Sequence, residues 1–287
     1  MNTQKTKIPG PIYVILASLC FSIGGLCIKY IPWHPMAING ARNIISSTII
    51  FLFLKASGHK LRFNRIVLIG ALTLSLTTIL YTTANKLTTA GNAIILQYTA
   101  PVFVMLFSTF IYKRKPSRLD ILTAVLVMTG VLFFFVDSLT AGNMLGNVLA
   151  LLSGITYAGI FMMNSSEESD SLSSTFFGMV INVIIGLPFV LQLDFPSVTA
   201  GTWTAILSLG IIQIGLAYIF LNLGLATTPP IAACLINGLE PVLNPVLVAV
   251  FYGEVLTPLS IAGAVVVLVT VIGYNILSSV QISSQLP

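Results

Sequence analysis

A single acidic residue, Glu240, lies deep within a long apolar stretch, residues 229–252. It is about eleven residues from the start of that stretch, or roughly 16 Å along an α-helix, which places it near the middle of a bilayer. A charge there costs roughly 2.5–3.5 kcal/mol on insertion scales and marks a functional residue by default. Asn237 and Asn244 share its helix face. We expect this face to line a hydrated cavity. The alternative is a protonated Glu240 that braces neighbouring helices.

Arg42 is a second charged residue within an apolar stretch, residues 35–54. It lies about seven residues, or roughly 10 Å, from the nearer end. An arginine side chain can extend that far to the membrane interface, so an anchor or a structural ion pair is one interpretation. The other is that Arg42 faces the same cavity as Glu240. The two residues would then suit the two charged groups of an amino acid.

Further polar side chains within apolar stretches extend the set of candidates for the cavity lining. In the internal repeat described below, Gln97 corresponds to Asn237, whereas Glu240 corresponds to Ala100. Only one half of the chain therefore supplies an acid, which favours a bound molecule with a positive or donor-rich end. A carboxyl group shut away from water resists ionisation, so Glu240 could exchange a proton for such a cation. The remaining candidates are Tyr81, Tyr98, Tyr157 and Gln213.

The elements that position these residues are hydrophobic helices. The sequence is 56% hydrophobic and 7% charged, with a mean hydropathy of +0.99, whereas a soluble chain carries roughly 25% charged residues. About 17–25 apolar residues cross a membrane. We predict an all-α integral membrane protein with ten such spans and no soluble domain. The spans are residues 11–31, 35–54, 66–83, 89–112, 119–136, 145–163, 175–191, 202–223, 229–252 and 259–277.

The chain contains an internal duplication. Residues 88–131 recur without a gap as residues 228–271, an offset of 140, and a weaker match at an offset of 136 pairs Gly10 with Gly146. We predict two five-span repeats, residues 1–139 and 140–287. Because five is odd, the second repeat must enter the membrane inverted relative to the first, and such repeats are typical of secondary transporters.

Two prolines occupy matching positions in the fourth and ninth spans. Pro101 and Pro241 are related by the repeat offset of 140. A proline inside a helix removes one backbone hydrogen bond and clashes with the preceding turn, and in a membrane the freed carbonyl needs a protein partner or a wet cavity. The two prolines could bend their helices for packing, or they could serve as gating points.

Lysine and arginine predict the orientation. They favour the cytoplasmic side, and the N-terminus with the loops after the second and fourth spans holds most of them. We therefore predict that both termini are cytoplasmic. The net charge of +5 is an orientation signal and gives no support to nucleic-acid binding, because the charges are scattered over short loops. The basic residues on that side are Lys5, Lys7, Lys55, Lys60, Arg62, Arg65, Lys113, Arg114, Lys115 and Arg118.

These features together resemble the drug/metabolite transporter superfamily, EamA type. The resemblance rests on the ten spans, on Gly40-Ala41-Arg42, on Ala100-Pro101-Val102 and on Glu240-Pro241-Val242 with Gly253-Glu254 closing the ninth span. It covers nearly the whole chain. It implies a basket of spans one to four and six to nine around a central cavity, with spans five and ten outside. The chain departs from the family at Lys113-Arg114-Lys115, where a glutamate more often ends the span.

We therefore predict a secondary transporter in the plasma (inner) membrane that works by alternating access and exports small metabolites such as amino acids or amines. An uncoupled facilitator or a channel for small polar solutes is the alternative. No nucleotide-binding module or partner subunit is evident, so the partners are the substrate, the lipid bilayer and possible coupling protons. An enzyme is disfavoured, since no nucleophile or histidine cluster occurs at either interface.

Other chemistry is not indicated. Cys20, Cys27 and Cys234 all lie in predicted spans without paired spacing, so neither a disulfide nor a metal site is expected, and we predict no cofactor. His59 is expected in a loop. The acidic residues Glu167, Glu168 and Asp170 are expected to form a solvated turn.

Overall fold

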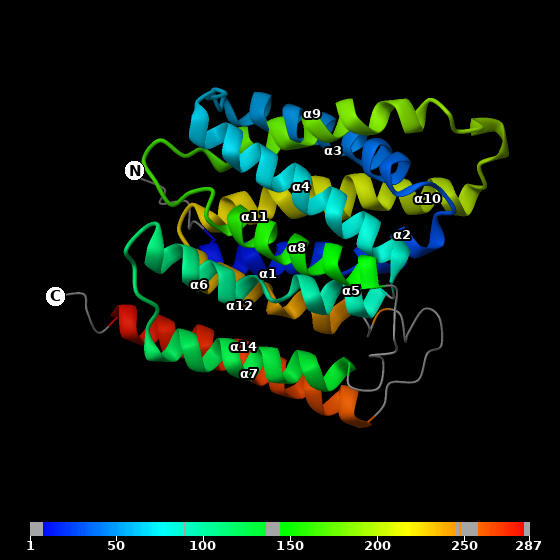
Figure 1. Ribbon diagram of the computed structural model, residues 1–287. Coiled ribbons are helices and arrows are strands. Elements are labelled where there is room, and N and C mark those ends of the chain that lie inside the picture. Colours follow the sequence, from blue (N-terminus) through cyan, green and yellow to red (C-terminus); the bar gives the residue numbers. More distant parts are fainter. Residues whose placement is uncertain (1–7, 89, 136–143, 245–246, 248–257, 284–287) are drawn as a thin grey trace, which may run out of the picture.

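A computed structural model describes residues 8–88, 90–135, 144–244, 247 and 258–283, and all regular structure in these ranges is helical. The helices run alongside one another in a single bundle (Figure 1). The first half contains α1 (Gly10–Phe21), α2 (Gly24–Tyr30), α3 (Pro35–Ser57), α4 (Arg65–Leu87), α5 (Ala90–Gln97), α6 (Ala100–Phe110) and α7 (Arg118–Phe135).

The second half begins with α8 (Met144–Phe161) and α9 (Ser171–Val190). A 3₁₀ turn, η1 (Phe195–Ser197), leads to a long helical stretch made of α10 (Ala200–Ser208), a π-helix η2 (Leu209–Leu216) and α11 (Ala217–Leu225). The described chain ends with α12 (Pro230–Ile236), the 3₁₀ turn η3 (Asn237–Leu239), a helical segment 240–244 and α14 (Pro258–Ser283).

Local sequence signals fix several helix ends. Pro35 occupies the first position of α3, where its missing N–H costs nothing. Gly58 ends the same helix with a φ of 67°, a left-handed conformation that glycine adopts freely. Asn64 caps α4 by accepting a hydrogen bond from the N–H of Val67 at 2.8 Å. Thr199 caps α10 in the same way.

Six helical stretches in the described part of the chain are long and apolar enough to cross a membrane. They match the predicted first, second, third, sixth, seventh and eighth spans: Gly10–Tyr30, Pro35–Ser57, Arg65–Leu87, Met144–Phe161, Ser171–Val190 and Ala200–Leu225. The protein is thus an all-helical multi-pass membrane protein. The full count of ten stays a prediction. The parts of the predicted spans at residues 89, 136, 245–246 and 248–252 lie outside the described residues, as do Gly253-Glu254, Lys5 and Lys7.

Each of the matching prolines lies two residues after a break in its helix. Pro101 is in the first turn of α6, directly after the interruption at Tyr98 and Thr99. Pro241 follows η3, and there the N–H of Glu240 reaches the carbonyl of Asn237, the group that Pro241 leaves without an α-helical donor. The helix restarts at Ala100 and at Glu240, one residue before each proline. Packing and gating both stay predictions for the two prolines.

Close backbone contact joins the two halves. α3 packs along α9, α4 along α8 and α9, and α1 along α11. A Cβ atom on Gly186 of α9 would lie 2.4 Å from the Cα of Gly40 in α3, so these two helices meet with no side chain between them. α7 and α14 pack against each other and lie together along one side of the bundle (Figure 1).

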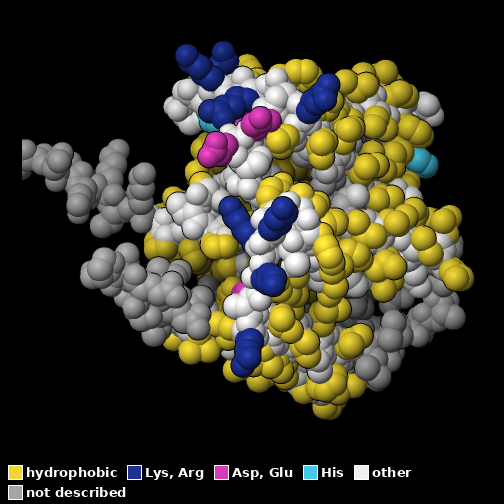
Figure 2. Space-filling model, turned by 60° about the vertical axis from the view of Figure 1, so that its left-hand side comes forward, with side chains coloured by type: hydrophobic (Ala, Val, Ile, Leu, Met, Phe, Trp, Pro, Cys, Tyr) yellow, Lys and Arg dark blue, Asp and Glu magenta, His cyan; other side chains and the backbone are white. Residues whose placement is uncertain are grey.

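Positive charge gathers at one end of the bundle. Figure 2, which looks toward the end that carries the loops after α3, α6 and α8, shows lysine and arginine side chains over this face. We call this face the basic end. It is defined by the exposed residues Lys55, Lys60, Arg62, Arg65, Lys113, Arg114, Lys115 and Arg118.

Candidate functional site

A cavity of about 30 Å³ lies within the bundle. Its lining comes from α1, α3, α4, α5, α8, η2, α11 and the segment after η3, whereas α7 and α14 supply none of it. α9, which matches the seventh predicted span, supplies no lining residue either. The lining residues are Phe21, Arg42, Thr77, Thr78, Tyr81, Gln97, Tyr157, Gln213, Ile214, Tyr218 and Glu240.

Glu240 enters this central cavity from the segment that follows η3. Its side chain is buried, and Oε2 accepts hydrogen bonds from Asn237 Nδ2 at 2.9 Å and from the hydroxyl of Tyr157 at 3.2 Å. Asn237 Nδ2 also donates to the Tyr157 hydroxyl at 2.9 Å, and Asn237 Oδ1 accepts from Ser18 Oγ at 2.9 Å. Three elements, α1, α8 and η3, therefore hold one carboxyl group in place.

Arg42 enters the same cavity from α3 and does not extend to the membrane interface. Its residue is 1% exposed, so the interpretation as an interfacial anchor was wrong. The cause is a set of nearby acceptors on α4: Nη2 donates to Thr82 Oγ1 at 2.7 Å and to the carbonyl of Thr78 at 3.3 Å. Nη2 also donates to Asn39 Oδ1 at 3.0 Å. Among the described residues the guanidinium forms no ion pair, and its Nε has no hydrogen-bond partner.

The π-helix η2 places Gln213 beside Arg42. Gln213 Oε1 accepts a hydrogen bond of 3.4 Å from Arg42 Nη1. The amide of Gln213 leaves little room on the opposite side, where a Cβ on Gly24 would be 3.0 Å from Nε2. π-helical turns are rare and frequent at functional sites.

Six of the nine predicted binding residues line one cavity: Arg42, Tyr81, Gln97, Tyr157, Gln213 and Glu240. Asn237 does not line the cavity itself but donates a hydrogen bond to Glu240, which does. These residues come from six separate segments of the chain. Their convergence is a geometric fact that spacing along a single helix did not reveal.

Tyr98 and Asn244 do not line the cavity, contrary to the sequence prediction. The Tyr98 hydroxyl donates to the carbonyl of Cys234 at 3.1 Å, so it ties the break between α5 and α6 to α12. Asn244 instead packs against α2, where a Cβ on Gly25 would be 2.7 Å from its Nδ2. Residues 240–244 are α-helical, so Asn244 still follows Glu240 by one helical turn, but the cavity lining on this face ends at Glu240. Pro101 and Pro241 lie outside the lining as well.

The sequence reasoning missed five lining residues. Two of them, Thr77 and Thr78, belong to a run of hydroxyl side chains on α4, in which Ser75, Thr78 and Thr82 recur at helical spacing. That polar stripe was a readable signal for a helix facing a polar interior. Phe21, Ile214 and Tyr218 gave no such signal in the sequence, because aromatic and aliphatic residues occur in every span.

The cavity combines one cation, one acid and neutral hydrogen-bonding groups. A guanidinium binds carboxylates by paired hydrogen bonds, and a buried carboxylate can bind an ammonium group. The cavity has a volume of about 30 Å³ and holds one or two water molecules at most. The conformation described here is therefore closed around the charged residues.

Comparison with known proteins gives related transporters. The chain is 24% identical to the pseudopaline exporter CntI of Pseudomonas aeruginosa over 93% of this chain and 95% of that protein. It is 28% identical to the uncharacterized transporter YxxF of Bacillus subtilis, over 58% of this chain but only 55% of that protein. It is 27% identical to the uncharacterized inner membrane transporter YedA of Escherichia coli, over 51% of this chain and 48% of that protein.

One solved structure, named only as the crystal structure of a protein, shares the fold. It superimposes with a TM-score of 0.79 at 17% identity, over 93% of this chain and 97% of that one. The model of the EamA-like transporter family matches twice, over residues 8–136 and 144–276. This protein is therefore a transporter and not an enzyme, and the chain belongs to the EamA-like transporter family.

Proposed function

We propose that this protein exports small metabolites that carry both a positive and a negative group, such as amino acids, by alternating access at the central cavity. The observation that carries the proposal is that Arg42 and Glu240 line one cavity while each is held by neutral partners. Two buried charges of opposite sign that do not satisfy each other are costly. A substrate with a carboxylate and an ammonium group would offset that cost.

Amines are the second substrate class in this proposal, and Glu240 alone would bind them. Its carboxyl group lies against Tyr157, so an entering ammonium group would exchange with the hydroxyl and amide donors now bound to Oε2. Proton exchange at Glu240 would couple the outward movement of a cation to inward movement of a proton. The alternatives are an uncoupled facilitator and a channel, neither of which needs a titrating group.

The substrate must enter through a movement of helices, because the cavity is too small for a metabolite. The interruptions at Tyr98-Thr99 and at η3 are suited to such movement, since discontinuous helices form the binding sites of many secondary transporters. Both lie next to the cavity residues Gln97 and Glu240. Pro101 and Pro241 follow these interruptions and are the gating candidates.

An inverted repeat of residues 1–139 and 140–287 is supported by which helices pack together. In such a repeat α1 is equivalent to α8, α3 to α9, α4 to α11 and α7 to α14. The α4–α8 contact is then equivalent to the α1–α11 contact, and the α3–α9 and α7–α14 contacts each join two equivalent helices. Figure 1 draws α7 and α14 with opposite chain directions, as an axis in the membrane plane requires. Two separate matches to the family model also support the duplication.

The basic end is the cytoplasmic face in this proposal, because lysine and arginine are retained there. Both termini then lie in the cytoplasm. The outward direction is supported by the relative that is named an exporter and that aligns over 93% of this chain.

A ligand screen followed by flux measurement tests the proposal. Amino acids and amines are added to the purified protein, and a compound that binds only the folded state raises its melting temperature. Stabilising compounds are then loaded into proteoliposomes with an imposed proton gradient. We expect saturable, proton-driven flux of zwitterions. Flux without saturation would support a channel, gradient-independent flux would support a facilitator, and stabilisation only by anions lacking an amine would contradict the role of Glu240.

A further inference from the structure

A second pocket, which we call the basic pocket, lies at the basic end of the bundle. Its volume is about 440 Å³, and it shares no lining residue with the central cavity. It lies between the end of α3, the loop that follows it, the start of α9 and the end of α11. The residues that line it are Phe53, Ser57, Gly58, His59, Lys60, Arg62, Leu172 and Leu223.

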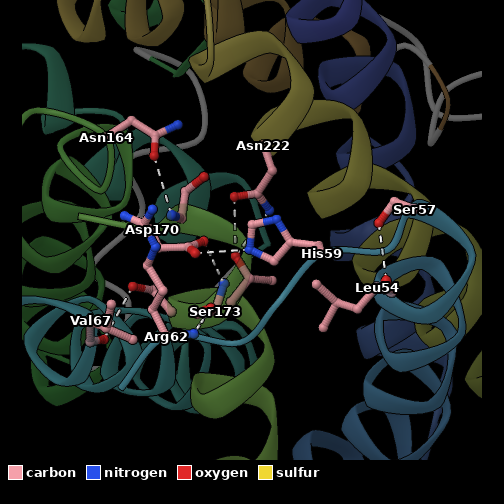
Figure 3. A network of polar contacts seen from close by, with 12 residues as sticks. Leu54, Ser57, His59, Arg62, Val67, Asn164, Asp170, Ser173 and Asn222 are labelled. Atoms are coloured by element: carbon pink, nitrogen blue, oxygen red, sulfur yellow. Dashed lines mark hydrogen bonds and ion pairs between the residues drawn. The ribbon is translucent and has the colours of Figure 1, made fainter. Parts of the chain in front are cut away.

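The basic side chains of this pocket have no acidic partner within ion-pair distance among the described residues. Lys60 and Arg62 form no ion pair within the described residues, and no acidic residue lines the pocket. Asp170 lies close to the pocket but contacts other groups. Its Oδ2 contacts His59 Nε2 at 2.8 Å, and its Oδ1 accepts a hydrogen bond from the N–H of Ser173 at 3.0 Å. Figure 3 shows His59 and Asp170 pointing toward one another.

The loop that carries the charges is held in a fixed position. The N–H of Arg62 donates to Ser173 Oγ at 2.9 Å, and Asn64 Nδ2 donates to the carbonyl of Glu168 at 2.8 Å. Figure 3 draws the Arg62–Ser173 contact beside the His59–Asp170 pair. Two carbonyls in the last turn of α3, those of Leu54 and Lys55, would repel an anion but already accept from the N–H groups of His59 and Gly58. The pocket is therefore preorganised for negative charge.

The opposite wall of the pocket is apolar. Phe53, Leu172 and Leu223 are partly buried and pack against the hydrophobic core. A ligand that fits both walls has an anionic oxygen group on one side and hydrocarbon on the other. Basic pockets between membrane helices on the cytoplasmic side commonly bind phospholipid headgroups.

We propose that the basic pocket binds a phosphate ester, with its phosphate on Lys60 and Arg62 and its carbon skeleton against Phe53, Leu172 and Leu223. This chemistry has two possible sources: the headgroup of an anionic membrane phospholipid and a soluble organic phosphate. A phosphate ester bound here would link α3 and α9 to α11, which also borders the central cavity through Tyr218.

The test compares three probes on the purified protein in detergent: phosphatidylglycerol, phosphatidylcholine and glycerol 1-phosphate. Affinity and melting temperature are measured for wild type and for Lys60→Gln/Arg62→Gln. The matched control, Lys113→Gln/Arg114→Gln, removes two charges from the same basic end outside the pocket. A third variant, Leu223→Trp, fills the apolar wall and keeps every charge. The melting temperature without probe shows whether each variant is folded.

We expect phosphatidylglycerol or glycerol 1-phosphate to bind wild type and the control alike, and to bind Lys60→Gln/Arg62→Gln about thirtyfold more weakly, since each basic residue near the surface contributes about 1 kcal/mol. Leu223→Trp should weaken binding as well. Binding of the lipid alone identifies the headgroup as the ligand, and binding of the soluble ester identifies a metabolite. Equal losses in the pocket variant and the control would overturn the proposal, as would binding by neither anionic probe.

Discussion

The side chain of Asn237 donates to Oε2 of Glu240 at 2.9 Å, three residues further along the same segment. A 3₁₀ turn joins the two residues, and the same amide also bonds to Tyr157. One of the hydrogen bonds that position the carboxyl group of Glu240 therefore comes from its own segment of the chain.

Glu240→Gln should abolish proton-driven transport while the protein stays folded. An amide keeps the size of the side chain and an oxygen that accepts from Asn237 and Tyr157, but it neither titrates nor attracts a cation. We expect transport to fall at least about a hundredfold, the usual lower range for removing a proton-transfer group, and its pH dependence to flatten. Proteoliposome flux across pH measures both. Glu167→Gln, at an exposed acid in a loop, is the control. Coinciding pH profiles for wild type and Glu240→Gln would show that the site was assigned to the wrong residue.

Arg42→Lys should impair zwitterions more than simple amines. Lysine keeps the charge but cannot reach Asn39, Thr82 and Gln213 together with a substrate carboxylate. Loss of a charged hydrogen bond costs about 1.5–3 kcal/mol, so the KM for an amino acid should rise about tenfold to a hundredfold. The KM for the corresponding amine, which lacks the carboxylate, should change little. A similar rise for both substrates would mean that Arg42 only holds α3 against α4.

Gly186→Ala should destabilise the protein. The added Cβ would lie 2.4 Å from the Cα of Gly40, and because that atom is backbone, α3 and α9 must separate. Overpacking of this kind costs about 1–3 kcal/mol. Gly273→Ala is the matched control, since its Cβ would meet nothing within 4 Å. The melting temperature in detergent should fall for Gly186→Ala and stay level or rise for Gly273→Ala. A tolerated alanine at position 186 would show that these helices are less closely fixed than their geometry implies.

Neutralising the basic end should disturb the orientation of the chain. No lysine or arginine follows Arg118 in the sequence, so the second half offers no competing signal. We expect a variant with neutral residues at positions 60, 62, 65 and 113–115 to insert in both orientations. Reporters fused after the final helix and within the loop after α3 measure the two populations. Uniform native orientation would contradict the argument.

The sequence predicted the fold class and most of the cavity because these depend on polarity. Arg42, Gln97, Gln213 and Glu240 stand out since a polar group is costly in an apolar span. Such residues are expected to face one shared cavity, because contact with lipid is costly for polar groups. Helical spacing also predicted that Asn237 would accompany Glu240, and the two are hydrogen-bonded.

The remaining features depend on backbone geometry that polarity does not encode. Asn244 lies one helical turn after Glu240 but packs against α2, and helical spacing does not show how far a cavity extends along a helix face. Asp170, expected in a solvated turn, is 8% exposed because it caps α9 and pairs with His59 from the other half. Contacts between loops more than a hundred residues apart leave no local pattern in a single sequence.

The π-helix η2 gives the unequal lengths of the two halves a physical location. The repeat offset grows from 136 near the first span to 140 at the fourth, so the second half gained four residues between these points. Within that interval Ala200–Leu225 has 26 residues against 23 in Arg65–Leu87, and a π turn closes its hydrogen bonds over five residues instead of four. Part of the difference in length thus lies inside a helix, at the turn that presents Gln213. The two repeats therefore differ in backbone length as well as in side chains where they border the cavity.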